Sequence, residues 1–484
     1  MRYLDATILF VILLAAPAAA AGISLLPREG IEILSSLIGA AVAVISSALI
    51  IGTRISGTFG YFYSDGLTQV MTITIASIYL TSLAYSVFYI KHVKEPLFKF
   101  RWYYSLVDLF AFTMLLAVVV NDIGFIWIAV EATTVTSALL VALERERTSV
   151  EAAWRYTLIV SAGLATSLLS VVLVYYSQGT LSISSLIGKS IESVPIMALA
   201  VGFALVGYGT KAGIAPMHAW LPDAHSEAPS PVSAMFSGIL LPTSLYAFAR
   251  TFGLLQGSTA FDATRNLTIG FGIFTALVAA VILGYQRNYK RMLAYSSMEN
   301  MGIILVGFAL GGVGAIGAVI QIVAHAFAKS SAFYESGNIL ASYNSKNMSE
   351  VQGVVNRLRS TGYLFSLSAL SITGAPPFGV FIGEFLILVQ AVNSGNLLLA
   401  ALLGLSYAYA FVALNRQSIK MIFGSGEESD SVSIDTNTQT QEIVKATRED
   451  RLSLLIPFIN LAISLVIGIY MIPALLQAAV SFGL

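Results

Sequence analysis

Apolar segments long enough to cross a membrane follow one another along almost the whole chain. When the sequence is cut at charged residues and turn-forming clusters, about fourteen such segments remain, each near the ~20 residues that a spanning helix needs. Of the 484 residues, 57% are hydrophobic and only 11% are charged, a composition that no soluble domain shares. The sequence therefore predicts an all-α polytopic membrane protein.

Charge and cysteine content exclude several classes of function. The formal net charge is zero, so the chain has no electrostatic basis for binding nucleic acid. It contains no cysteine, which excludes disulfides, thiolate zinc sites and cysteine-ligated iron–sulfur clusters. We therefore expect no metal and no cofactor in this chain, and any redox chemistry must belong to another subunit.

The basic residues fall mainly on one side of the predicted membrane. With fourteen spans, nineteen lysines and arginines lie on one side and five on the other, leaving Lys211 and Lys329 inside the apolar segments. The positive-inside rule makes the basic side cytoplasmic and places both termini outside a cell (plasma) membrane. Residues 425–450 form the one long polar stretch, which predicts a flexible cytoplasmic loop at 416–452 before a last helix within 453–484.

Two apolar segments are interrupted by glycine and proline next to ionisable residues. In the first, Lys211 is followed by Gly213 and Pro216 and then by His218 and His225. A lysine inside the membrane is costly and usually has a partner and a function. In the second, the string TGAPPFGVFIGE leads to Glu384. Breaks at membrane depth are tolerated only where the backbone is buried in protein or lines a watery cavity.

The two broken helices are the seventh and the twelfth, and an odd offset of five inverts the topology. Paired breaks of this kind indicate inverted repeats around a site near the membrane midplane. We expect a three-helix segment at 1–100, a first repeat of helices four to eight at 101–255, and a second of helices nine to thirteen at 256–415. Under this offset Glu131 corresponds to Glu299.

These ionisable residues suggest a proton relay. Burial and pairing act in opposite directions on the pKa of a lysine or carboxylate, so a partner that approaches or withdraws can load and release a proton. His325 and Lys329 are four residues apart and share a helix face, and His218 lies seven beyond Lys211. Each residue also has a structural alternative. Lys211, Glu131 and Glu384 could form static ion pairs, and Lys329 and His325 could cap or bridge neighbouring helices. Glu299 could lie at the membrane–water interface, and His225 could cap a helix.

Four strings in the sequence resemble the antiporter-like membrane subunits of respiratory complex I, multisubunit sodium/proton antiporters and energy-converting membrane hydrogenases. The strings are KAGIAPMHAWLPDAHSEAPSPVSA (211–234), KRMLAYSSMENMG (290–302), HAFAKSSAFYESGNI (325–339) and GAPPFGVFIGEFL (374–386). SSMEN, the SGNI ending and TGAPPFG are most similar to the branch that contains the hydrogenase-4 and formate-hydrogenlyase members.

The resemblance implies fourteen helices with two inverted five-helix repeats, and it assigns roles to single residues. It implies that Glu131 pairs with Lys211, that His325 and Lys329 form the central relay, and that Glu384 is the ionisable residue of the second broken helix. One position departs from the family pattern. Many members carry a lysine in a Leu-Leu-Lys motif of the eighth helix, whereas here Pro242 follows Leu240 and Leu241. A relay across this gap needs water, His218, or the polar residues Ser237, Thr243 and Ser244.

We conclude from the sequence that the chain is a proton-translocating membrane subunit of a multisubunit redox complex of the hydrogenase or complex I type, with sodium as the other candidate ion. The expected partners are other membrane subunits and a peripheral oxidoreductase arm. Two alternatives remain open. One is a module of a gradient-driven sodium/proton antiporter, and the other is a non-transporting membrane scaffold for a soluble oxidoreductase.

Overall fold

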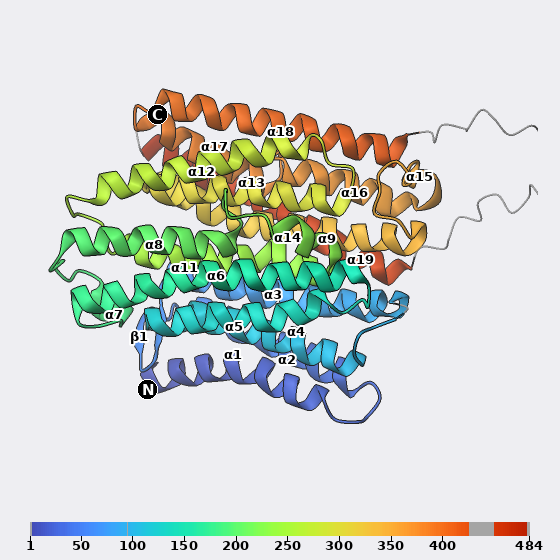
Figure 1. Ribbon diagram of the computed structural model, residues 1–484, viewed down its shortest axis with the longest axis horizontal. Coiled ribbons are helices and arrows are strands. Elements are labelled where there is room, and N and C mark those ends of the chain that lie inside the picture. The colour runs from blue at the N-terminus through green and yellow to red at the C-terminus, as the bar shows by residue number, and fades with distance from the viewer. Residues whose placement is uncertain (1, 94, 425–449, 482–484) are drawn as a thin grey trace, which may run out of the picture.

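The protein is a bundle of helices that run roughly parallel to the long axis of the molecule (Figure 1). The computed structural model describes residues 2–93, 95–424 and 450–481. Thirteen of the described helices are long and apolar enough to cross a membrane, and a shorter apolar helix, Gly379–Asn393, completes a split fourteenth crossing. The predicted all-α polytopic fold is therefore confirmed, and the only sheet among the described residues is the hairpin of β1 (Gly57–Phe59) and β2 (Phe62–Ser64).

The crossings follow one another in chain order. In the N-terminal part they are α1 (Arg2–Ser24), α2 (Ile31–Gly52), α3 (Gly66–Tyr89), α4 (Phe100–Val119), α5 (Ile123–Val141), α6 (Arg147–Gln178), α8 (Val194–Ala212) with the short α9 (Leu221–Glu227), and α10 (Ser230–Met235) continued by the π-helix η2 (Phe236–Leu240) and α11 (Leu241–Gly253). In the C-terminal part they are α12 (Phe261–Leu283), α13 (Tyr289–Leu310), α14 (Gly312–Tyr343), α16 (Arg359–Ile372) with α17 (Gly379–Asn393), α18 (Leu397–Phe423) and α19 (Arg451–Ser481). Three short pieces, η1 (Ile90–His92), α7 (Ile183–Leu186) and α15 (Val354–Arg357), lie in the connections.

Helix starts are set by side chains that the sequence places just before each apolar run. Asp65, Asp122, Asn288 and Asn396 each accept a hydrogen bond from a main-chain N–H in the first turn of the helix that follows. Such caps supply partners for N–H groups that have none within the helix. They fix where α3, α5, α13 and α18 begin.

Small residues let the helices approach closely. A Cβ on Gly163 would fall within 2.5 Å of Thr210, and one on Gly207 within 2.5 Å of Ser167, so α6 and α8 pack backbone to backbone. Gly272 and Gly302 allow the same close approach of the backbones of α12 and α13. Association inside a bilayer depends on such close packing because lipid supplies little hydrophobic driving force between helices.

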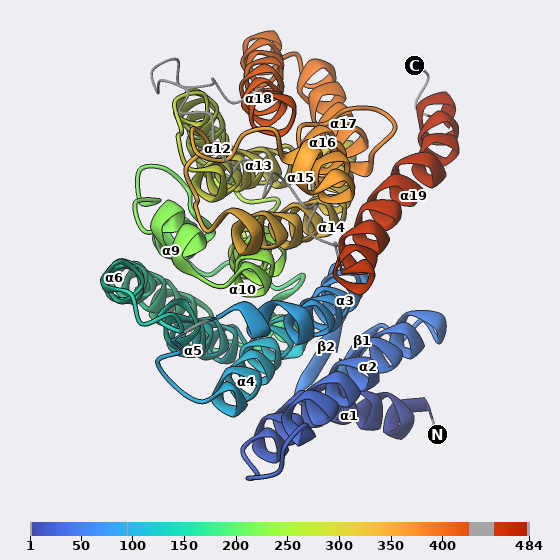
Figure 2. The ribbon, with the colours of Figure 1, turned by 90° about the vertical axis from the view of Figure 1, so that its right-hand side faces the viewer.

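Helix α3 lies between the two halves of the bundle (Figure 2). It contacts α4 of the N-terminal half, α10 and α14 near the middle, and the last helix α19. Within the N-terminal half, Asp108 on α4 accepts hydrogen bonds from Ser24, Ser36 and Tyr79, which ties α1, α2 and α3 to α4. This carboxylate is buried and serves as a structural clamp.

One predicted boundary differs from the structure. The sequence places residues 416–423 in the loop 416–452, but α18 continues to Phe423. The extension is stabilised because Ser418, Met421 and Ile422 are buried, and Gln417 donates hydrogen bonds to carbonyls at the end of α12. Residues 425–449 lie outside the described residues, and the division into two inverted repeats stays a prediction.

Candidate functional site

The helix that carries Lys211 is broken directly beyond it. Gly213 adopts a φ of 78°, and a Cβ there would overlap the side chain of Leu221. The main chain in the break has a partner on another helix, because Ala215 N donates to Thr275 Oγ1 of α12 at 3.0 Å. The break is therefore a packed structure with satisfied backbone groups, as membrane depth requires.

Lys211 is fully buried against α5. Its Nζ donates to the main-chain carbonyl of Val130 at 2.8 Å and to Thr134 Oγ1 at 2.5 Å. Glu131 follows Val130 and accepts a hydrogen bond from Ser161 of α6 at 2.7 Å through Oε1. The ammonium group of Lys211 and the carboxylate of Glu131 thus lie at the same turn of α5, and each is held by its own uncharged partners.

The pairing of Lys211 with Glu131 is not a direct ion pair in this conformation. No nitrogen–oxygen contact within 4 Å joins them in the part of the chain that the structure describes. The second carboxylate oxygen of Glu131 is buried without a hydrogen-bond partner among the described residues. An unpaired buried oxygen next to a buried lysine leaves room for a contact that forms in another state.

Lys329 on α14 is held in a similar way. Its Nζ donates to the main-chain carbonyl of Leu293 at 2.7 Å and to the hydroxyl of Ser296, both on α13. Glu299 lies one turn beyond Ser296 on the same helix and is also buried. The interfacial position considered for Glu299 is therefore wrong, since its side chain points into the bundle.

In the second break, the carboxylate of Glu384 lies directly against Gly374. Gly374 adopts a φ of 68°, and a Cβ there would overlap Glu384 Oε2. Asn415 on α18 donates to Thr373 Oγ1 at 2.9 Å and so ties the end of α16 to its neighbour. The carboxylate occupies the space that any larger residue at position 374 would need.

Two amide side chains, those of Asn300 and Gln321, lie between Glu299 and Glu384. Asn300 donates to Glu299 Oε2 at 3.0 Å, and Gln321 donates to Asn300 Oδ1 at 2.6 Å. Gln321 in turn lies against α17 at Gly383, next to Glu384. Sequence reasoning missed Asn300 and Gln321 because they carry no charge. The available signal was an amide directly after Glu299 and another inside the apolar run of α14.

His325 lies one turn from Lys329 on α14, against the π-helix. Gly238 allows the contact, since a Cβ there would lie 3.1 Å from the carbonyl of Ala326. His325 lies beside the main chain of Ser237, yet neither ring nitrogen has a well-formed hydrogen bond among the described residues. The Ser237 hydroxyl is 2.6 Å from that of Ser297 on α13. A π-helical turn of this kind often marks a functional site.

The other polar residues near Pro242 are engaged locally. Thr243 donates back to the carbonyl of Ile239 on its own helix at 2.7 Å, and Ser244 donates to the carbonyl of Tyr208 on α8 at 2.7 Å. Of the three residues considered for this gap, Ser237 is the one whose main chain lies beside His325.

The histidines of the first break occupy different environments. His218 is half-buried and packs edge-on against Tyr295, with ring centroids 6.4 Å apart. The break removes the helical register with Lys211 that the seven-residue spacing suggested. His225 is buried; its Nδ1 is 2.8 Å from the carbonyl of Leu221, and its Nε2 has no partner among the described residues. Aromatic rings surround it, namely Trp220, Phe236 and Phe333.

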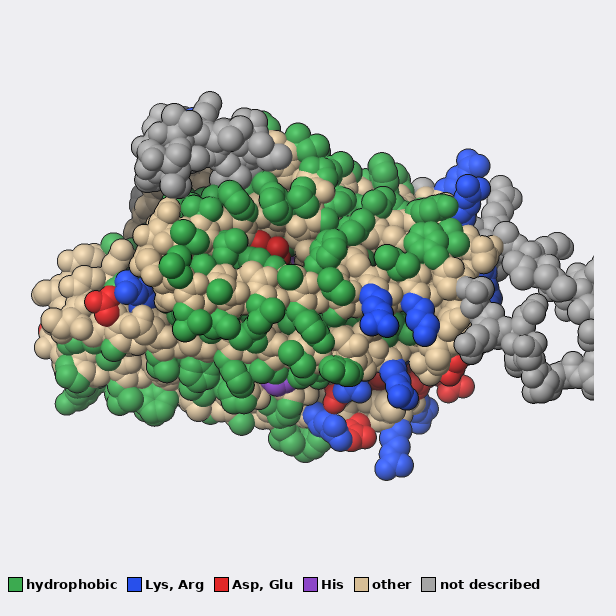
Figure 3. All heavy atoms as spheres, turned by 90° about the horizontal axis from the view of Figure 1, so that it is seen from above, with side chains coloured by type: hydrophobic (Ala, Val, Ile, Leu, Met, Phe, Trp, Pro, Cys, Tyr) green, Lys and Arg blue, Asp and Glu red, His purple; other side chains and the backbone are tan. Residues whose placement is uncertain are grey.

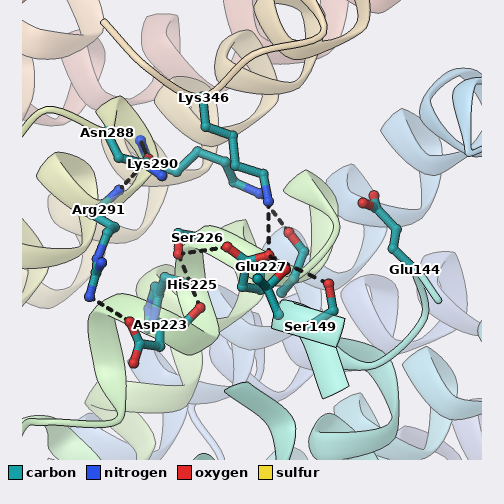
Figure 4. A network of polar contacts seen from close by, with 12 residues as sticks. Glu144, Ser149, Asp223, His225, Ser226, Glu227, Asn288, Lys290, Arg291 and Lys346 are labelled. Carbon is teal, nitrogen blue, oxygen red and sulfur yellow. Dashed lines mark hydrogen bonds and ion pairs between the residues drawn. The ribbon is translucent and has the colours of Figure 1, made fainter. Parts of the chain in front are cut away.

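Ion pairs hold the short helix α9 at the end of the molecule that carries the basic loops. Figure 4 shows Arg291 reaching Asp223, with a contact of 2.5 Å, and Lys346 reaching Glu227 at 3.0 Å. Burial raises the pKa of Glu227, but Lys346, Lys290 and Thr148 together lower it by more, so its pKa lies below the ordinary value. Lys290 lies beside this network. Across the described ranges, no three His, Asp or Glu side chains come together as a metal site.

Comparison with known proteins gives a family and several relatives. The family described as "NADH:quinone oxidoreductase/Mrp antiporter, TM" matches residues 120–408. A hydrogenase-4 component F homolog of Methylacidiphilum infernorum (isolate V4) is 32% identical over 385 residues, which cover 75% of this chain and 79% of the relative. Hydrogenase-4 component B of Escherichia coli (strain K12) is 28% identical over 341 residues, or 66% of this chain and 49% of the relative. The chain thus spans about half the length of this second protein.

Solved structures share the fold over nearly the whole chain. A chain of the membrane-bound sulfane sulfur reductase, an archaeal respiratory membrane complex, aligns with a TM-score of 0.83 and 21% identity, covering 97% of this chain and 95% of that one. A chain of the Mrp complex from Dietzia sp. DQ12-45-1b aligns with a TM-score of 0.81 and 19% identity, covering 96% and 95%. A chain of respiratory complex I from Thermus thermophilus aligns with a TM-score of 0.76 and 23% identity, covering 95% and 96%.

Proposed function

Because the chain belongs to the family of antiporter-like transmembrane proteins of NADH:quinone oxidoreductases and Mrp antiporters, we propose that it translocates protons as one subunit of a membrane redox complex. One observation carries the proposal. Two buried lysines, Lys211 and Lys329, each lie against a helix that presents a carbonyl, a hydroxyl and a carboxylate. Ionisable residues inside a membrane protein usually mark an ion pathway.

The proposed chemistry uses the lysines as proton carriers and the carboxylates as their regulators. An ammonium at Lys211 donates to Val130 and Thr134, and the approach of Glu131 would stabilise the charge while its withdrawal would release the proton. The same logic applies to Lys329 and Glu299, which the amides connect to Glu384. Moving one charge against ~100 mV takes about 2.3 kcal/mol, which a change in the distance between two buried charges can supply.

Orientation and partners form part of the proposal. The excess of lysine and arginine gathers near one end of an otherwise apolar surface (Figure 3), which supports cytoplasmic basic loops and external termini in the cell membrane. The relatives are chains of hydrogenase-4, sulfane sulfur reductase and complex I, so the partners would be other membrane subunits and a peripheral oxidoreductase arm. The proposed translocation requires no cofactor or metal in this chain.

A second candidate is gradient-driven sodium/proton antiport, which the similarity to a chain of the Mrp complex favours. The two candidates differ in the driving force. Redox-coupled translocation requires electron transfer by the attached arm, whereas antiport requires only an ion gradient. A non-transporting scaffold would depend on neither.

The test is transport by the assembled complex in sealed vesicles, followed with a pH-sensitive dye. Substrate oxidation should acidify one compartment, and Lys211→Met should abolish this while the complex remains intact. Lys189→Met is the matched control. That lysine is partly exposed at the end of the molecule opposite the basic loops, where it contacts Glu192. Acidification driven by a sodium gradient without oxidation would favour antiport, and unchanged transport in Lys211→Met would remove the lysine from the mechanism.

A further inference from the structure

A buried carboxylate outside the proposed relay lies where three helices meet. Glu335 of α14 is fully buried, and its Oε1 accepts hydrogen bonds from Ser331 on the same helix at 3.1 Å and from Ser368 of α16 at 3.2 Å. Ser331 Oγ also lies 2.8 Å from the main-chain carbonyl of Pro457 on α19. These four residues, which we call the Glu335 cluster, therefore join α14 to both α16 and α19.

No cationic side chain balances the charge of this carboxylate. None of the ion pairs among the described residues includes Glu335. Its second oxygen, Oε2, is buried without a hydrogen-bond partner in the same part of the chain. A carboxylate held away from water is costly unless a positive charge accompanies it. That charge must come from outside the protein, as a proton or as a metal cation.

Asp108 shows how the hydrogen-bonding capacity of a buried carboxylate can be met within the protein. Its Oδ2 accepts from Ser24 and Ser36, and its Oδ1 accepts from Tyr79. Both oxygens of Asp108 thus have partners. At Glu335, by contrast, both hydroxyl contacts fall on one oxygen and the other oxygen has none.

The hydroxyl hydrogens of the Glu335 cluster are too few for its contacts. Ser331 lies within hydrogen-bonding distance of Glu335 Oε1 and of the Pro457 carbonyl, and Ser368 lies within that distance of Glu335 Oε1 and of Ser331 Oγ. Each hydroxyl has one hydrogen, so two hydrogens serve four contacts between oxygens. Close oxygens that share too few hydrogens are typical of a site that surrounds a cation.

The oxygen spacing and the charge of the cluster indicate which cation fits. Ser331 Oγ, Ser368 Oγ and Glu335 Oε1 form a triangle with sides of 3.0, 3.1 and 3.2 Å. Oxygen ligands at ~2.4 Å from one ion lie about 3.4 Å apart at adjacent octahedral positions, so a small expansion turns this triangle into one face of such a shell. One carboxylate among neutral oxygens matches a single positive charge. A larger monovalent ion such as potassium would hold the oxygens farther apart.

We propose that the Glu335 cluster binds one sodium ion, held by the Glu335 carboxylate, the hydroxyl oxygens of Ser331 and Ser368, and the Pro457 carbonyl. The site lies eight residues, or about 12 Å, from the end of α14 at Tyr343. The bound ion fastens α19 to α14 and α16 and takes no part in translocation. The proposal therefore goes beyond the proposed function and does not depend on it.

Thermal unfolding tests the site directly. The full-length protein is purified in detergent without sodium, and its melting temperature is measured while NaCl replaces KCl at constant ionic strength. An ion that binds only the folded protein raises the melting temperature until the site saturates. We expect NaCl to raise it by at least about 2 °C over KCl, and we expect KCl to match choline chloride.

Substitution then places the ion. Glu335→Gln keeps the shape of the side chain and removes its charge, so the difference between NaCl and KCl should disappear. Asp108→Asn is the matched control, because it neutralises a buried carboxylate on α4 whose oxygens already have partners. It should lower the melting temperature in both salts and leave their difference unchanged. If Glu335→Gln does not fold, Ser368→Ala keeps the carboxylate and removes one ligand, and the NaCl concentration that gives half the shift should rise severalfold.

Two results would overturn the proposal. Equal melting temperatures of the native protein in NaCl and KCl at every concentration would mean that a proton, with or without water, completes the Glu335 cluster. A sodium-specific shift that persisted in Glu335→Gln, or a half-shift concentration unchanged in Ser368→Ala, would mean that sodium binds elsewhere in the protein.

Discussion

Lys211 and Lys329 are each held by the same two kinds of acceptor, on different helices. Each donates to a main-chain carbonyl and to a hydroxyl within one turn of it, Val130 and Thr134 for the first and Leu293 and Ser296 for the second. A carbonyl has two lone pairs, so it can accept from a lysine without losing its helical hydrogen bond. The two lysines come from the fourth helix of one predicted repeat and the third of the other. Similar environments therefore arise at positions that the repeats do not make equivalent.

The proximity of Glu131 to Lys211 predicts that the two residues act together. Glu131→Gln removes the charge that would stabilise the ammonium, so transport should fall at least about tenfold, equivalent to about 1.4 kcal/mol. Lys211→Met should abolish transport, and the double variant should be no worse than Lys211→Met alone. The measurement is the initial rate of dye-detected acidification in vesicles that contain the assembled complex.

Glu151→Gln is the control for Glu131, because Glu151 is an exposed carboxylate that pairs with Arg155 on the surface of α6. Its substitution should leave transport unchanged. If Glu131→Gln transported as fast as the native protein, the carboxylate would not act together with Lys211.

The carboxylate over Gly374 predicts a specific effect of a single methyl group. Gly374→Ala strains a left-handed backbone position by roughly 1–2 kcal/mol and also pushes Glu384 out of its place. Gly395→Ala has the same kind of backbone strain, at a φ of 73°, but meets nothing within 4 Å. Both variants should lower the melting temperature, and only Gly374→Ala should also impair transport. Equal transport in the two variants would show that the position of Glu384 is unimportant.

Much of this architecture could be predicted from the sequence. The fourteen crossings follow from apolar length, and the two breaks follow from Gly213, Pro216 and Gly374 next to ionisable residues. Burial of Lys211 and Lys329 follows from their position in apolar runs, since a charged side chain in such a run faces the interior of the bundle. These inferences need only local patterns, so no knowledge of the helix packing was required.

The remaining parts of the site depend on which helices meet. Nothing in the sequence around Thr134 shows that its hydroxyl faces Lys211, and Asn300 and Gln321 look like ordinary polar residues of apolar helices. Their roles come from contacts across the bundle. The π-helix at Phe236–Leu240 was also not predicted, because an extra residue in one turn leaves no periodic signal in so short a segment. The gap at Pro242 was found, but not the closeness of Ser237 to His325.

An ion pair at the end opposite the basic loops predicts a pH-dependent stability. Arg250 donates to both oxygens of Asp65, at 2.5 and 2.7 Å, and joins α11 to the start of α3. Burial raises the pKa of Asp65, but Arg250 and the hydrogen bonds from Thr68 together lower it by more, so its folded pKa lies below the ordinary value. The pair therefore stabilises the fold above the unfolded pKa of about 3.9, and this contribution is lost as pH falls through the folded pKa.

Asp65→Asn should accordingly lower the melting temperature of the detergent-solubilised protein at pH 7, and the difference from the native protein should shrink as the pH falls below about 4. Asp262→Asn is the control, because Asp262 is 77% exposed where it meets Arg265. Its effect should be small at every pH. A difference for Asp65→Asn that persisted undiminished at low pH would mean that the carboxylate stabilises the fold without its charge.

The unpaired nitrogens of the buried histidines predict ordered water beside their rings. Both nitrogens of His325, Nε2 of His225 and the hydroxyl of Tyr208 are buried without partners in the described chain. Each would cost about 1–3 kcal/mol if left dry, and a polar site of this kind is where ordered water is expected. A high-resolution structure of the complex should therefore show water within hydrogen-bonding distance of the His325 ring and of the Ser237 hydroxyl.

The function of that water can be tested by substitution at the π-helix. Ser237→Ala removes the hydroxyl that lies 2.6 Å from Ser297, so it should slow proton transfer toward Lys329 and reduce transport severalfold. Thr243→Val is the matched control, because the hydroxyl it removes is bonded to its own helix. If transport continued although apolar side chains excluded water from His325 in every observed conformation, the proton path would be confined to one half of the subunit. Equal rates in the two variants would exclude Ser237 from the path.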